Sequence, residues 1–188
     1  MSEHPGQSRI RVTAPAGAHV IRCIDAHTEG EPLRVVLDGF PEPEGETILQ
    51  RRRFARRHLD GLRTALMWEP RGHADMYGCI VVPPERPESD FGVLFIHNEG
   101  YSTMCGHGVL AMARVAVEAG LVPARTPETR IQMDTPAGPV LATADVSLTP
   151  GGTPRVTAVR FRNVPSWSAG LDQEVRVPGL GVVPYDLG

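Results

Sequence analysis

Cysteine and long apolar runs are both scarce in this chain. Its 188 residues include three cysteines, Cys23, Cys79 and Cys105. An odd and widely spaced set does not form the disulfide framework of a small secreted domain. No apolar run approaches the roughly 20 residues that a membrane helix needs, and the first residues lack the apolar core of a signal peptide. We therefore expect a protein of the reducing cytoplasm without a membrane partner.

An excess of charge of one sign is also missing. The chain has 19 basic and 22 acidic side chains and a net charge of −3, which gives no indication of a polyanionic partner. One short stretch is basic, but Phe54 is the one aromatic residue among its arginines and the net charge of the chain is negative, so we expect a solvated helix face and no nucleic-acid partner. These arginines are Arg51, Arg52, Arg53, Arg56 and Arg57.

Glycine and proline are abundant, with 20 and 18 residues, and this favours a turn-rich chain containing many strands over a helical bundle. The length is enough for one domain with a substantial core. Residues 1–19 carry small and polar residues without periodicity, so they are predicted to form a flexible tail.

Short apolar segments predict the strands. Residues 19–26, 33–37, 76–82 and 91–96 have strand character, residues 130–134 and 140–144 form a predicted hairpin, and 156–161 alternate as a strand does. Thr47 is a suitable N-cap for a helix over residues 48–68, with an interruption near Asp60 and Gly61.

The most informative stretch is residues 101–120, in which a strand and turn lead through Cys105 into a helix. Apolar residues recur at helical spacing after position 108, and Gly120 is a natural C-terminal stop. The helix should begin near Gly106, with Cys105 at or just before its N-terminus. A helix N-terminus lowers the pKa of a thiol. The N–H groups of Gly106, His107 and Gly108 would form an anion site.

Other interpretations of Cys105 remain open at this point. A free cysteine is often a small buried core residue. The pair Cys105 and His107 also suggests zinc, although no second pair of ligands with zinc spacing follows. A Cys-His hydrolase would need a base beside the thiol, and His107, two residues away on a helix start, is expected to be poorly placed for that role.

Three blocks resemble, in order, the proline racemase family of proline racemases, 4-hydroxyproline 2-epimerases and trans-3-hydroxy-L-proline dehydratases. They are residues 25–32 (Asp-Ala-His-Thr-Glu-Gly-Glu-Pro), 69–78 (Glu-Pro-Arg-Gly-His-Ala-Asp-Met-Tyr-Gly) and 104–108 (Met-Cys-Gly-His-Gly). The resemblance extends from about residue 20 to the C-terminus. Residues 97–103, His-Asn-Glu-Gly-Tyr-Ser-Thr, are more similar to the dehydratases than to the racemases and epimerases.

The resemblance implies an α+β fold like one half of diaminopimelate epimerase, with a mostly antiparallel, barrel-like sheet around a central helix. Residues 20–165 would form this first half. Residues 166–188 would begin an incomplete second half with a hairpin over 175–183. Family members are longer than this chain, which corresponds to their N-terminal half, and they are commonly homodimers.

The resemblance also implies a cofactor-independent lyase that converts trans-3-hydroxy-L-proline to pyrroline-2-carboxylate. Cys105 would remove the α-proton, and Gly106, His107 and Gly108 would bind the carboxylate of this imino acid, without a metal. The family's second reactive position, Cys in racemases and epimerases and Thr in dehydratases, would lie beyond residue 188. The alternatives are a 4-hydroxyproline 2-epimerase or proline racemase, and an inactive fragment.

Overall fold

The computed structural model describes residues 13–188, so the first twelve residues of the predicted tail lie outside the described part. No regular element precedes Arg22 in it. None of the helices in residues 13–188 has the length and apolar character needed to span a membrane.

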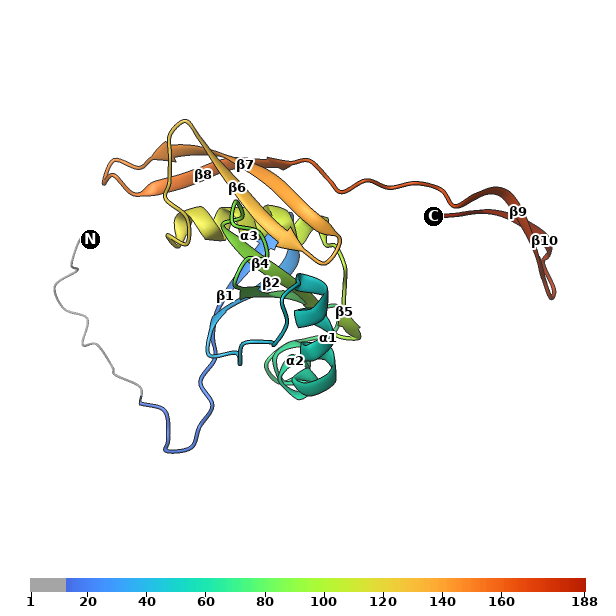
Figure 1. The fold of residues 1–188 in the computed structure, drawn as a ribbon, viewed down its shortest axis with the longest axis horizontal. Helices are drawn as coiled ribbons and strands as arrows, with labels where there is room; N and C mark the ends of the chain where they lie inside the picture. The colour runs from blue at the N-terminus through green and yellow to red at the C-terminus, as the bar shows by residue number, and fades with distance from the viewer. Residues whose placement is uncertain (1–12) are drawn as a thin grey trace.

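One eight-stranded sheet forms the main body (Figure 1). Seven strands pair in the order β1-β2-β3-β4-β6-β7-β8, and the short β5 pairs with β4. The pairs β2–β3 and β4–β6 are parallel, and the other pairs are antiparallel. The strands are β1 (Arg22–Thr28), β2 (Glu31–Asp38), β3 (Tyr77–Val82), β4 (Phe91–His97), β5 (Gly100–Tyr101), β6 (Glu128–Thr135), β7 (Gly138–Leu148) and β8 (Pro154–Phe161). The predicted mostly antiparallel sheet is confirmed, and β5 was not predicted.

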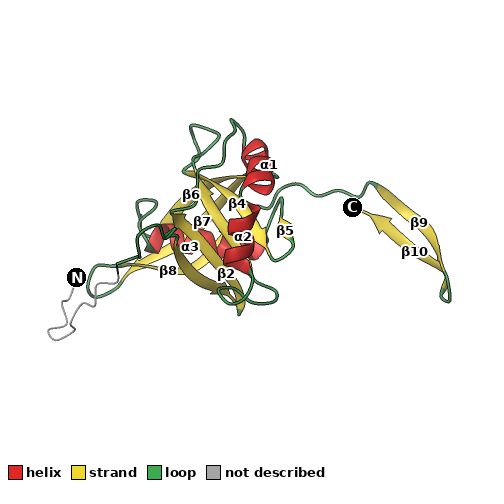
Figure 2. Ribbon diagram, turned by 90° about the horizontal axis from the view of Figure 1, so that it is seen from below, coloured by secondary structure: helices red, strands yellow, loops and turns green. Residues whose placement is uncertain are grey.

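Helix α3 (Gly106–Glu118) is the predicted central helix, and the curled sheet passes around it (Figure 2). It packs against strands from both ends of the sheet, β1 and β2 on one side and β7 and β8 on the other. Eight of its residues are buried, which fits the apolar recurrence in its sequence. The helix ends where predicted, since Gly120 has φ +77°, a conformation that favours glycine.

Strand β4 lies between two hydrophobic clusters, and this explains its continuous apolar sequence. Val93 and Phe95 face the cluster around α3, and Leu94 and Ile96 face the cluster under the other two helices. Successive side chains of a strand point to opposite faces, so a strand that is covered on both faces has apolar residues at every position.

Helices α1 (Ile48–His58) and α2 (Asp60–Met67) cover the second face and divide the predicted helix near its expected interruption. Thr47 is the N-cap and forms a capping box with Gln50. The prediction of a fully solvated arginine face was wrong for two residues. Arg51 and Arg52 are half-buried and donate to the backbone carbonyls of Pro83, Gly45, Tyr101 and Ser102, because α1 packs beside these loops.

Asp134 in β6 is fully buried and fixes the loop between β3 and β4. One carboxylate oxygen accepts from the backbone N–H groups of Glu85 (2.8 Å) and Arg86 (2.9 Å). The other accepts from the Arg86 guanidinium (2.7 Å) and the Ser89 hydroxyl (2.9 Å). These four hydrogen bonds give a buried charge the partners that it needs.

Strands β9 (Gly170–Val177) and β10 (Gly181–Leu187) form a separate two-stranded hairpin that lies apart from the main sheet (Figure 1). A hairpin was predicted over residues 175–183, and the observed one is longer. Several of its apolar side chains are exposed, namely Leu171, Val175, Leu180, Val182, Tyr185 and Leu187.

Candidate active site

Cys105 is the N-cap residue of α3, as predicted from the sequence. Its backbone is extended, and its carbonyl accepts the first helical hydrogen bond, from the Val109 N–H at 3.0 Å. The segment before it is also held in place, because Ser102 N–H donates to the Phe95 carbonyl at 3.1 Å. The sulfur therefore lies where β4 and β5 lead into the start of the central helix.

Two amides beside the sulfur have no acceptor within residues 13–188. They are the N–H groups of Gly106 and His107, the first two of the helix. The third amide, that of Gly108, lies near the Cys105 sulfur and lowers the pKa of its thiol. The helix start thus offers two free donors to an anion, while the third supports the thiol.

The His107 ring lies beside the thiol, with Nδ1 3.4 Å from the Cys105 sulfur. We expected this ring to be poorly placed as a base, and that expectation was wrong. It reaches the sulfur because Cys105 is the extended N-cap, so its side chain lies over the first turn of the helix. At this distance the imidazole can accept the thiol proton.

The three sequence blocks meet at His107. Thr28, from the first block, donates its hydroxyl to the His107 carbonyl at 3.1 Å. Tyr77, from the second block, stands edge-on to the His107 ring, with ring centroids 4.9 Å apart. We did not predict roles for Thr28 and Tyr77, although both lie inside blocks that resemble the family. His27, also in the first block, stabilises its own turn, since its Nδ1 accepts from the Gly30 N–H.

We expected the start of the helix to lower the pKa of the Cys105 thiol, and that expectation was wrong. Burial raises this pKa, the Gly108 N–H lowers it, and Glu31 raises it further, so the net shift is upward. The side chain belongs to a residue that is only 7% exposed, and removal from water disfavours the thiolate more than one amide favours it. Formation of the thiolate therefore needs a proton acceptor, and the His107 imidazole is close to the sulfur, with Nδ1 at 3.4 Å.

The other two cysteines occupy different environments. Cys79 in β3 is fully buried, and burial raises its pKa out of the physiological range. Cys23 in β1 is half-buried, and burial also raises its pKa. Within residues 13–188, no group of three His, Cys, Asp or Glu side chains is placed to hold a metal ion.

The Cys105 sulfur and the Phe95 ring leave little room for a side chain at position 108, and this gives a testable prediction. A Cβ there would lie 3.0 Å from the Cys105 sulfur and 3.2 Å from the Phe95 ring. We expect Gly108→Ala to lower the unfolding free energy by about 1–3 kcal/mol, the usual cost of overpacking. It should also displace the sulfur and slow its alkylation. Urea denaturation and labelling by iodoacetamide would measure the two effects.

Gly106→Ala is the matched control, because its Cβ would meet only the Phe161 ring, at an ordinary 3.6 Å. We expect a change within about 0.5 kcal/mol and an unchanged alkylation rate. Equal behaviour of the two variants would show that the sulfur is not packed against position 108.

A family model described as proline racemase matches residues 23–188. The chain belongs to this family. It is 49% identical over 180 residues to the trans-L-3-hydroxyproline dehydratase of Xenopus tropicalis, covering 95% of this chain and 50% of that protein. With the human trans-3-hydroxy-L-proline dehydratase it shares 50% identity over 174 residues, covering 91% and 48% of the two chains. With the 4-hydroxyproline 2-epimerase of Streptosporangium roseum it shares 48% over 168 residues, covering 89% and 49%.

Solved structures agree with this assignment. A probable proline racemase from Agrobacterium radiobacter K84, solved with bound carbonate, superposes with a TM-score of 0.80 at 29% identity, covering 89% of this chain and 48% of that one. A hydroxyproline epimerase from Agrobacterium vitis gives 0.79 at 24% identity, covering 88% and 48%, and supports the fold alone. The proline racemase-like α+β fold is therefore confirmed. The chain spans about half the length of the curated relatives that it matches.

Proposed function

We propose that this protein acts as a trans-3-hydroxy-L-proline dehydratase, a cofactor-independent hydro-lyase that forms pyrroline-2-carboxylate. The observation that carries this proposal is the placement of Cys105 beside the free amides of Gly106 and His107. Further support comes from identities of 49–50% to proteins named as dehydratases of this imino acid.

In the proposed mechanism the substrate carboxylate binds at the N–H groups of Gly106 and His107, with Gly108 completing the first turn. His107 accepts the Cys105 proton, and the resulting thiolate removes the α-proton as a general base. The electron pair of the C–H bond forms a double bond to C3, and the 3-hydroxyl leaves as water after taking up a proton. The enamine product then tautomerises to the imine. The amide donors stabilise the negative charge that develops on the carboxylate side.

A 4-hydroxyproline 2-epimerase is the second candidate, favoured by the 48% identity to the Streptosporangium roseum protein. The first steps would be the same, but a proton would return to the opposite face instead of hydroxide leaving. Incubation with trans-3-hydroxy-L-proline and with trans-4-hydroxy-L-proline separates the two. We expect water loss from the first compound and no epimer from the second, and the reverse pattern would contradict the dehydratase assignment.

We also propose the division of the chain into a first half, residues 20–165, and the start of a second, residues 166–188. The separate sheet of β9 and β10 supports it.

We further propose a cytoplasmic homodimer. Free cysteines at positions 23, 79 and 105 are typical of a protein in a reducing compartment. The exposed apolar side chains of the β9–β10 hairpin favour a dimer in which a second copy of the chain covers them.

A further inference from the structure

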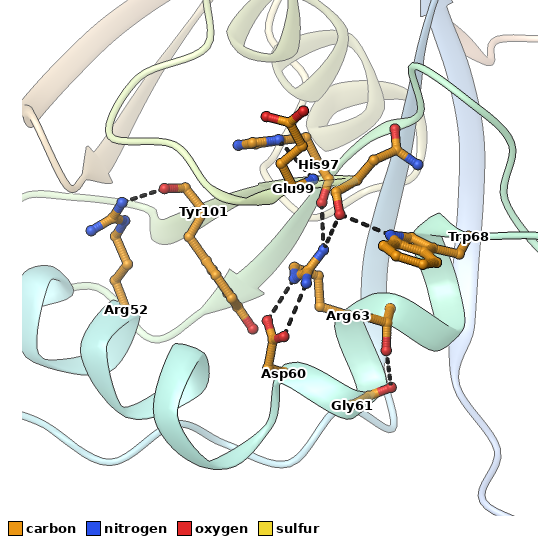
Figure 3. A network of polar contacts seen from close by, with 10 residues as sticks. Arg52, Asp60, Gly61, Arg63, Trp68, His97, Glu99 and Tyr101 are labelled. Atoms are coloured by element: carbon orange, nitrogen blue, oxygen red, sulfur yellow. Dashed lines mark hydrogen bonds and ion pairs between the residues drawn. The ribbon is translucent and has the colours of Figure 1, made fainter.

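Arg63 is a buried arginine on α2 whose guanidinium contacts the turn between β4 and β5. The residue is 4% exposed. Two of its nitrogens donate to the Asp60 carboxylate at 2.6 and 2.9 Å, and Nη1 donates to the carbonyls of His97 (2.8 Å) and Asn98 (2.7 Å), as Figure 3 shows. A planar guanidinium can make all these bonds at once, which a lysine ammonium cannot.

The same turn is fixed by further bonds from the end of α2. The Asn98 carbonyl also accepts from the Trp68 indole N–H at 2.8 Å. The Asn98 side chain donates to the carbonyls of Met67 (2.9 Å) and His73 (2.8 Å). Glu99 N–H donates to His97 Nδ1 at 3.2 Å, so both the backbone and the ring of His97 are held.

A row of three rings joins this turn to the candidate active site. The His97 ring lies 5.8 Å from the Tyr77 ring, centroid to centroid, and these residues face each other across β3 and β4. Tyr77 contacts the His107 ring edge-on at 4.9 Å, and His107 Nδ1 lies 3.4 Å from the Cys105 sulfur. A displacement of the turn would therefore reach the thiol through ring-to-ring contacts.

We propose that Asp60 and Arg63 are positioning residues for the Cys105–His107 pair. By holding the His97 backbone, they fix its ring against Tyr77, and Tyr77 in turn keeps the His107 imidazole beside the sulfur. This inference rests on the proposed function of Cys105. Its test uses the chemistry of the thiol alone, so a protein without dehydratase activity can still confirm or contradict it.

The test compares Arg63→Met with Arg57→Met, which changes an exposed arginine of α1. Iodoacetamide labels the native protein over a range of pH, and mass spectrometry of the peptide that contains Cys105 distinguishes it from Cys23 and Cys79. We expect Arg63→Met to slow labelling near neutral pH by about twofold or more, which is the low end of the effects seen between energetically coupled residues. The midpoint of the pH profile should also move upward. Arg57→Met should retain the wild-type profile.

A double-mutant cycle identifies the route. In the background of His107→Gln, the substitution Arg63→Met should have no further effect on labelling, because the imidazole through which it acts is absent. An equal effect with and without His107 would overturn the proposal, as would a wild-type profile for Arg63→Met.

If Arg63→Met does not fold, Tyr77→Leu interrupts the same row of rings and leaves the guanidinium bonds intact. It should reproduce the shifted profile, and an unshifted profile would overturn the proposal.

Discussion

Under the proposed dehydratase function, replacing Cys105 by serine is expected to lower turnover of trans-3-hydroxy-L-proline by about 10²- to 10⁴-fold, the usual contribution of a positioned general base. A hydroxyl is much less acidic than a thiol, so the neighbouring His107 imidazole, whose Nδ1 lies 3.4 Å from the sulfur, cannot generate the corresponding base. Serine is close to cysteine in size, so the fold should be retained. Steady-state rates of product formation would measure the loss.

Cys23→Ser is the control for this substitution. Cys23 lies in β1, is half-buried and packs with the cluster under α1 and α2, away from the start of α3. Its loss should leave turnover within about twofold of wild type, since it touches no group in the proposed reaction. A Cys105→Ser variant that folds normally and turns over at the wild-type rate would contradict the role given to this sulfur.

Replacing Asp134 by alanine is expected to lower the free energy of unfolding by about 3 kcal/mol, the low end of the range for breaking a buried ion pair. The carboxylate is fully buried, and its removal leaves the N–H groups of Glu85 and Arg86 and the Ser89 hydroxyl without their acceptor. We expect a loss of stability at this low end because the Arg86 side chain is 34% exposed, so water can solvate its charge once the carboxylate is gone. Urea denaturation at neutral pH measures the change.

The same residue predicts a pH dependence. Burial alone raises the pKa of the Asp134 carboxyl, but the hydrogen bonds from Arg86, Ser89 and Glu85 outweigh it and hold the pKa below its usual value. The stabilisation is therefore fully present above the unfolded-state pKa of about 3.9, and it is lost as pH falls through the lower folded-state value. The difference between wild type and Asp134→Ala should shrink in acid.

Asp145→Ala is the matched control, because Asp145 pairs with Arg160 on the surface. We expect a loss below about 1 kcal/mol, as for other exposed ion pairs. If Asp134→Ala costs no more than Asp145→Ala at neutral pH, the network around Asp134 contributes little to stability.

Local signals in the sequence were enough to predict the elements around the site. Thr47 indicates a helix start within a few residues, and Gly120 supplies the conformation that ends α3. The strands that line the core have apolar patterns that depend only on neighbouring positions. For these elements the prediction from sequence and the structure agree closely.

Contacts between distant segments were not predictable in the same way. Nothing near Arg63 in the sequence indicates that it lies against the carbonyls of His97 and Asn98, and Asp134 is an ordinary acidic residue until the loop of Glu85 and Arg86 folds over it. The pKa of Cys105 was predicted in the wrong direction for the same reason. Its burial comes from the packing of the whole sheet around α3 and cannot be read from the helix start.

Hydrogen exchange into L-proline tests the central claim most directly, because this imino acid has no 3-hydroxyl to lose and reports proton removal alone. The wild-type protein in D₂O should place deuterium on the α-carbon, and the Cys105→Ser variant should not do so at a comparable rate. Undiminished labelling by the serine variant would contradict our account of the site.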